Sequence, residues 1–275
     1  MVSKKKKILL IQPRHGVWDG VFIRFPESVL SIAALPHAKG YDVTILDLRV
    51  TPRWEAVLQS YLADNKPICV GITSLTGPSL KDLLKSVEII KEHDNSIPIV
   101  FGGVHATLLP EQSLHTVPGV DVVVTYEGDY SFFEVVKVFE KNNLDEVMKS
   151  NALASVKGIY YRKSNVAEFQ HSQDSLAPIY EWKGRAMTLK SFPLVVDIDL
   201  PVTVTGTKSS DNNIEIAFTG DSPLIMDLDE LPDTPYELLD LSKYDAADLG
   251  NGVSASFQTS RGCPFACKFC GNEFL

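Results

Sequence analysis

The sequence predicts a doubly wound α/β fold for the first half of the chain, and three observations predict it. Five short apolar runs lie between residues 8 and 124, each of a length typical of buried strands. Segments with helical spacing of apolar residues separate most of these runs. Glycine and hydroxyl residues follow several runs, as expected of strand-to-helix loops. Strands that alternate with helices form a parallel sheet with right-handed crossovers and helices on both faces.

The elements follow in order along the chain. The first helix, Glu27–Lys39, ends at Gly40, a favourable helix-terminating residue, and Pro36 is expected to kink or shorten it. The remaining elements are expected at strand Ile8–Ile11, strand Val43–Leu46, helix Trp54–Ala63, strand Ile68–Ile72, helix Leu80–Ile90, strand Ile97–Phe101, strand Val120–Val124 and helix Ser131–Glu140.

The loops after the strands are the expected ligand site. In a parallel sheet, ligands bind at the carboxyl ends of the strands, near the point where the strand order reverses. The loops there cover residues 12–16, 73–77, 102–105 and 126–129. Each contains glycine, hydroxyl or small residues, which let the backbone approach a large ligand. We therefore expect four loops to share one site.

The rest of the chain has a different composition. Residues 149–232 are expected to form a β-rich connector, with strands at Gly158–Tyr161, Val195–Val204 and Ile214–Phe218, and an acidic, proline-containing linker at 227–235. A third region, 233–275, would open a new domain whose first strand is Val253–Phe257. The first domain is accordingly assigned to residues 1–148.

Composition excludes several classes of protein. The net charge of −9 argues against general nucleic-acid binding, which requires a cationic surface. No stretch approaches the roughly 20 apolar residues of a membrane span. Three of the four cysteines are crowded into the last residues, which is not a disulfide framework, so a reducing, cytoplasmic location is expected.

The three clustered cysteines indicate a metal centre. Cys263, Cys267 and Cys270 have C-x3-C-x2-C spacing. A structural zinc site normally has four ligands, and a redox dithiol would leave one thiol unexplained. Three thiolates better fit an iron–sulfur cluster with one iron open to a substrate or cosubstrate. The fourth cysteine, Cys69, lies within an apolar strand, where an inert buried thiol is expected.

The cysteine loop, with Phe269 before the last cysteine and the lead-in Thr259–Gly262, resembles the signature of the radical S-adenosylmethionine (SAM) superfamily. Upstream, residues 102–111 and 121–129 and the linker Leu228–Pro232 resemble the cobalamin-binding domain that precedes the radical SAM barrel in one branch of that superfamily. The chain is therefore identified as similar to a cobalamin-dependent radical SAM enzyme, ending soon after the cysteine motif.

The resemblance implies three cofactors. The three cysteines would ligate a [4Fe-4S] cluster whose fourth iron binds SAM, and Phe269 would lie by the adenine. Cobalamin would bind the Rossmann-like domain through Thr73, Ser74, Gly102, Gly103, His105, Glu127 and Gly128. The implied reaction is methyl transfer to an unactivated carbon by methylcobalamin and a 5′-deoxyadenosyl radical. A small-molecule substrate and an electron donor such as flavodoxin or ferredoxin are the implied partners.

Other classes of protein can contain the same α/β domain, and the sequence bears on each of them. The turn after the first strand, Gln12–Gly16, is not the G-x-G-x-x-G of a dinucleotide-binding domain. A phosphoacceptor domain would carry acidic residues where Gln12, Thr73 and Ser74 stand. The D-x-H-x-x-G motif that supplies a cobalt ligand in many cobalamin domains is absent, so no axial ligand is assigned, although His15 and His105 lie on the expected edge. The remaining alternative is a non-catalytic cobalamin-binding module or an inactive fragment, because nearly all of the barrel is missing and the chain alone is not expected to complete turnover.

Overall fold

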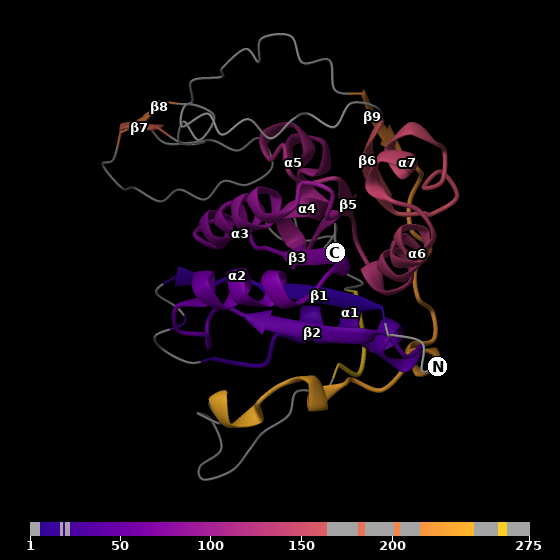
Figure 1. The fold of residues 1–275 in the computed structure, drawn as a ribbon, viewed down its shortest axis with the longest axis horizontal. Helices are drawn as coiled ribbons and strands as arrows, with labels where there is room; N and C mark the ends of the chain where they lie inside the picture. The colour runs from indigo at the N-terminus through magenta and orange to yellow at the C-terminus, as the bar shows by residue number, and fades with distance from the viewer. Residues whose placement is uncertain are drawn as a thin grey trace.

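The computed structural model describes residues 6–16, 19, 23–163, 181–184, 201–203, 215–244 and 258–262. Its centre is a seven-stranded sheet in the order β2-β1-β3-β4-β5-β6-β9 (Figure 1). The first five strands of this order are parallel, and the last two join antiparallel. The predicted doubly wound α/β fold is confirmed.

The sheet strands are β1 (Lys7–Gln12), β2 (Asp42–Asp47), β3 (Pro67–Thr73), β4 (Ile99–Gly102), β5 (Val122–Val124), β6 (Ile159–Lys163) and β9 (Glu215–Phe218). The helices are α1 (Glu27–Ala38), α2 (Trp54–Asp64), α3 (Ser79–His93), α4 (Val104–Leu108), α5 (Pro110–Thr116), α6 (Gly128–Lys141) and α7 (Leu144–Lys149). A separate antiparallel pair consists of β7 (Glu181–Gly184) and β8 (Pro201–Thr203).

Side chains alternate between the two faces of the sheet, as the period of a strand requires. One face packs against α2 and α3 and includes Leu9, Val70 and Phe101. The other packs against α1, α6 and α7 and includes Leu10 and Val100. Because both faces are covered, the strands carry nearly continuous apolar runs. Within the described residues, no helix has the length and apolar character needed to cross a membrane.

The strand order places a topological switch point between β1 and β3. From β1 the chain crosses to β2 at the edge, and it then returns to the other side of β1 to form β3. The loops that leave β1 and β3 therefore diverge, and a crevice opens at the carboxyl ends of these strands.

Two details differ from the sequence prediction. Pro36 does not shorten the first helix, which continues to Ala38. Its missing N–H removes one helical hydrogen bond close to the helix end, and the residue is buried. The helices α4, α5 and α7 were not predicted, because segments of five to seven residues are too short to display a helical period.

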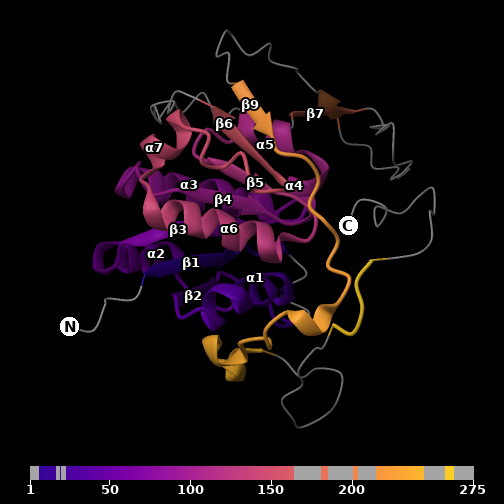
Figure 2. The same ribbon diagram turned by 90° about the vertical axis from the view of Figure 1, so that its right-hand side faces the viewer.

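Two segments of the connector, β6 and β9, extend the sheet. The predicted strands near 158–161 and 214–218 appear as β6 and β9. Residues 219–244 then pass beside α6 to the β2 edge, as both views show (Figures 1 and 2). There the ring of Phe25 contacts Tyr236 and Tyr244, with ring centroids 5.5 and 5.0 Å apart. The predicted strand Val253–Phe257 lies outside the described residues, and the domain boundaries near 148 and 232 stay predictions.

Candidate functional site

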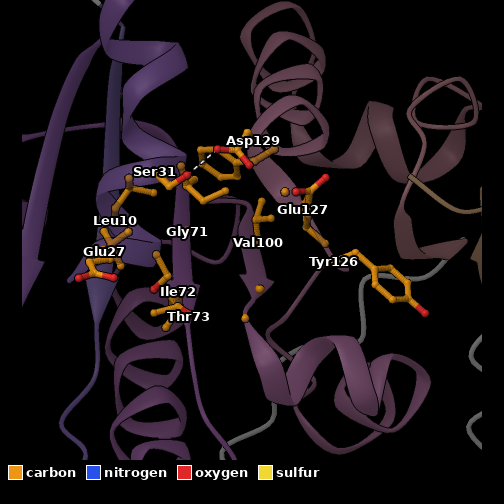
Figure 3. A pocket seen from close by; sticks show the side chains of 18 of the residues that line it. Leu10, Glu27, Ser31, Gly71, Ile72, Thr73, Val100, Tyr126, Glu127 and Asp129 are labelled. Carbon is orange, nitrogen blue, oxygen red and sulfur yellow. Dashed lines mark hydrogen bonds between the residues drawn. The ribbon is translucent and has the colours of Figure 1, made fainter. Parts of the chain in front are cut away.

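A pocket of about 450 Å³ lies at the carboxyl ends of β1, β3, β4 and β5, where the switch point predicts a ligand site. Residues of α1 such as Ser31 and of α6 such as Asp129 line its sides (Figure 3), and Gln258, Arg261 and Gly262 complete it. A volume of this size is typical of small-molecule sites.

The inner part of the pocket is apolar. Its lining includes Leu10, Val29, Ile32, Val100, Val124 and Phe132. Gly71 lies among them, and a methyl group in its place would come within 2.7 Å of the Leu10 side chain. The Phe132 ring lies 3.2 Å from the same point. Glycine at position 71 therefore lets α6 pack closely on β3 beneath the pocket.

Glycine backbone also forms the wall at β4. Gly103 has a φ of +92°, and a side chain there would collide with Thr73 and the Ser74 backbone. Gly102 is different, because a methyl group at this position would meet only the carbonyl oxygen of Val124, at 3.7 Å. The protein itself therefore has room for a side chain at Gly102, and the pocket occupies that room. This open backbone is what close approach of a large ligand requires.

A charged cluster forms the polar side of the pocket. Asp129, in the first turn of α6, accepts a hydrogen bond of 2.5 Å from the Ser31 hydroxyl of α1 (Figure 3). The Arg261 guanidinium donates to both carboxylate oxygens of Asp129, at 2.7 and 3.1 Å, and to Ser31 at 2.8 Å. Glu127 lies 3.6 Å from the same guanidinium. The hydrogen bond to Asp129 is the main cause that raises the pKa of Arg261.

Glu127 also anchors the linker. Its second carboxylate oxygen accepts a hydrogen bond of 2.7 Å from the backbone N–H of Ile225. The N-terminal end of α6 thus holds two distant segments, one around Ile225 and one around Arg261. A carboxylate at a helix N-terminus is favoured by the helix dipole.

The pocket brings together five residues predicted to bind cobalamin: Thr73, Gly102, Gly103, Glu127 and Gly128. Ser74 and His105 do not line it. Ser74 is buried, with its hydroxyl 2.7 Å from that of Ser79, and Nδ1 of His105 lies 3.0 Å from the Thr76 hydroxyl. Burial lowers the pKa of His105. The role predicted for these two residues stays a prediction.

Several pocket residues were not among the predicted site residues: Glu27, Ser31, Tyr126, Asp129, Phe132 and Arg261. Asp129 and Arg261 were visible within the family-like motifs, but nothing in the sequence shows that residues 132 positions apart form an ion pair. Tyr126 has a left-handed backbone, with φ +57°, and its ring extends away from the pocket centre (Figure 3). Such conformations in non-glycine residues concentrate at functional sites.

The described residues contain no group of three or more His, Cys, Asp or Glu side chains that could hold a metal ion, and no histidine among them lines the pocket. The predicted ligands Cys263, Cys267 and Cys270, and Phe269, lie outside the described residues. Cys69 is fully buried as expected, and burial raises the pKa of its thiol to about 12.

Comparison with known proteins identifies a matching family and several relatives. Residues 25–136 match the B12 binding domain family. The chain is 26% identical over 272 residues to the uncharacterized methyltransferase PH0819 of Pyrococcus horikoshii, covering 98% of this chain and 46% of that protein. It is 24% identical over 274 residues to the anaerobic magnesium-protoporphyrin IX monomethyl ester cyclase of Rubrivivax gelatinosus, covering 96% of this chain and 38% of that protein.

The chain thus spans less than half the length of these curated relatives. Among solved structures, the cobalamin-dependent S-adenosylmethionine radical enzyme OxsB with aqua-cobalamin and S-adenosylmethionine bound aligns with a TM-score of 0.46 and 19% identity, covering 57% of this chain and 21% of that one. The predicted resemblance to cobalamin-binding-domain-containing radical SAM proteins is confirmed, with residues 25–136 matching the B12 binding domain family.

Proposed function

We propose that this chain is the cobalamin-binding part of a cobalamin-dependent radical SAM enzyme that transfers a methyl group to an unactivated carbon of a small molecule. The observation that carries the proposal is the composition of the pocket wall. Gly262 lines the pocket, and the next residue in the sequence is Cys263, the first cysteine of the predicted cluster motif. One pocket therefore lies where a corrinoid site and a cluster loop would meet.

The pocket residues fit cobalamin in two ways. The apolar part, around Leu10, Val100 and Phe132, suits a flat aromatic group such as the base of the nucleotide tail. The open backbone at Gly102 and Gly103 would let a macrocycle lie against β4. Hydroxyl and carboxylate groups on the rim are suited to the amide side chains of a corrinoid.

Bound methylcobalamin would supply a transferable methyl group, and a SAM-binding [4Fe-4S] cluster would supply a substrate radical. The residues of this chain would bind and orient these groups. Thr73, Gly102, Gly103, Glu127 and Gly128 would hold the corrinoid, and Cys263, Cys267 and Cys270 would hold the cluster. The electron for SAM cleavage would come from a protein such as flavodoxin or ferredoxin.

Methyl transfer is proposed because the resemblance implies it and because one relative is named as a methyltransferase. The other relatives are named as cyclases acting on a magnesium-porphyrin ester, and they match the chain over a similar span. The substrate class therefore has to come from experiment.

The test is a two-part reconstitution under anaerobic conditions. Purified protein is titrated with hydroxocobalamin, followed by the absorbance of the bound corrinoid after gel filtration, and is then supplied with iron and sulfide. We expect one corrinoid per chain and a brown iron–sulfur chromophore that a Cys263→Ala, Cys267→Ala, Cys270→Ala variant lacks. That variant should still bind the corrinoid, because none of its changes lies among the pocket residues.

The two outcomes separate the proposal from its alternative. Corrinoid bound without any iron–sulfur chromophore in the unaltered protein would indicate a non-catalytic cobalamin-binding module. Absence of corrinoid binding would refute both readings.

A further inference from the structure

The segment that leads into the cysteine motif is held on the pocket by a single side chain. Among hydrogen bonds between described residues, those that join residues 258–262 to the rest of the protein all come from the Arg261 guanidinium. Its fourth hydrogen bond, 2.9 Å from Nε to Gln258, stays within the segment. Arg261 therefore determines where this segment lies on the α/β domain.

The contact has the features of a specific anchor. Two parallel N–H···O bonds to one carboxylate form the bidentate geometry that is strongest for arginine. The side chains are mostly buried, with exposed fractions of 16% for Arg261 and 5% for Asp129. The partners come from α1 and from the first turn of α6, so the guanidinium also bridges the two helices that wall the pocket.

The same residues line the pocket. Ser31, Asp129, Arg261 and Gly262 all contribute to its surface. A ligand that fills the pocket would therefore contact the anchor, and the anchor would complete the site for the ligand. Groups that share one set of contacts in this way influence each other reciprocally.

We propose that Arg261 is a positioning residue that couples occupation of the pocket to the placement of the chain directly before the cysteine motif. Corrinoid binding would stabilise the docked segment, and the docked segment would strengthen corrinoid binding. The inference rests on the proposed function for the identity of the ligand, whereas the anchor itself does not depend on it.

Trypsin provides a direct measurement, because it cleaves after arginine and the Arg261–Gly262 bond reports on the anchor. Asp129→Asn keeps the cleavage site but removes the carboxylate charge that pairs with the Arg261 guanidinium. We expect cleavage at this bond, followed by mass spectrometry of the products, to become about tenfold faster in the variant, since proteolysis follows the population of the opened segment.

Asp82→Asn is the matched control. Asp82 receives a bidentate pair of bonds from Arg14, both 2.7 Å, and neither residue lines the pocket. This substitution should speed cleavage after Arg14 and leave the rate at Arg261 unchanged. Equal rates of tryptic cleavage after Arg261 in the unaltered protein and in Asp129→Asn would show that the ion pair with Asp129 does not hold this segment on the domain.

The coupling is tested by adding saturating hydroxocobalamin. We expect cleavage at Arg261 to slow by about fivefold or more in the unaltered protein, and the affinity for hydroxocobalamin to fall by a similar factor in Asp129→Asn. Arg261→Gln should show the same loss of affinity and provides a second variant if Asp129→Asn fails to fold. Arg261→Lys keeps the positive charge but loses the planar guanidinium that forms two parallel hydrogen bonds. Its affinity for hydroxocobalamin should lie between those of the unaltered protein and Arg261→Gln.

These results distinguish the two proposals. If the unaltered protein binds hydroxocobalamin but its cleavage at Arg261 is unaffected, the coupling is wrong and the proposed function stands. If it binds no hydroxocobalamin, the proposed function fails, while the comparison of Asp129→Asn with Asp82→Asn still decides whether the anchor exists.

Discussion

The two faces of the sheet are built from the same kinds of aliphatic residue but end differently at the carboxyl edge. On the α2 and α3 face, Ile72 and Phe101 continue the core up to the edge, and His105 of α4 stacks on Phe101 with ring centroids 6.1 Å apart. On the α1 and α6 face, the positions near the edge are Gly71 and Gly102, and the pocket opens there. The difference shows how one sheet can be a packed core on one side and leave an open pocket on the other.

The largest expected difference between the two faces of the sheet is in the free energy of unfolding when a leucine on each face is replaced by alanine. Leu83→Ala, on the α3 side, removes a fully buried side chain that does not line the pocket and should lower the free energy of unfolding by about 2–5 kcal/mol. Leu10→Ala borders an existing cavity that water can enter, so its cost should lie in the lower half of that range. Urea unfolding measures both. A larger cost for Leu10→Ala would contradict the view that its face is incompletely filled.

The two leucine substitutions should also differ in their effect on corrinoid binding. Hydroxocobalamin affinity should be unchanged in Leu83→Ala and reduced in Leu10→Ala, because only Leu10 lines the pocket.

The next effect comes from filling the pocket. Gly102→Ala adds a methyl group that the protein can accommodate, because the nearest atom to it would be the Val124 carbonyl oxygen, at 3.7 Å. The free energy of unfolding should change little or rise, since alanine restricts the unfolded chain. Hydroxocobalamin affinity should fall by about tenfold, or 1.4 kcal/mol. Unchanged affinity measured by absorbance titration would show that the ligand does not approach β4.

The sequence predicted the sheet well because the central strands β1, β3, β4 and β5 contain buried apolar runs bounded by polar loops. It also predicted the edge at which the pocket lies, since that edge follows from strand alternation alone. Gly102, Gly103 and Glu127 were found in this way. The helices α4, α5 and α7 were not predicted, because short helices are stabilised by tertiary contacts and show no clear helical period in the sequence.

The polar side of the pocket was harder to predict for a different reason. The contacts of Arg261 join residues separated by 132 and 230 positions, and they depend on how the chain returns to the domain after β9. The sequence pattern around each of these residues contains no information on where the chain lies after β9. The two predicted residues outside the pocket, Ser74 and His105, follow the strand ends but point into hydrogen bonds with Ser79 and Thr76 instead.

A smaller effect concerns backbone strain. Tyr126, at the pocket, and Arg53, at the start of α2, are the non-glycine residues with positive φ in the described part of the chain. Replacing either by glycine should relieve about 1 kcal/mol of strain. Tyr126→Gly should also weaken hydroxocobalamin binding, whereas Arg53→Gly should not. If Tyr126→Gly alters stability alone, its strained conformation serves the fold and not the pocket.

The smallest effect should be a pH dependence that belongs to the filled face. Burial lowers the pKa of His105, so the unfolded chain, with a histidine pKa near 6.5, binds the proton more readily than the folded protein. The stability that comes from the neutral ring is complete above about pH 6.5 and is lost as the pH falls toward the lowered pKa.

Burial is also the main cause that lowers the pKa of His15, so the pH dependence of the unaltered protein contains contributions from both histidines. The difference in melting temperature between the unaltered protein and His105→Asn, measured from pH 7.5 to 5, isolates His105. It should change with pH in this range, while hydroxocobalamin affinity at pH 7.5 stays the same in both, because His105 does not line the pocket. A pH-independent difference in melting temperature would mean that His105 keeps its ordinary pKa and that this part of the core admits water.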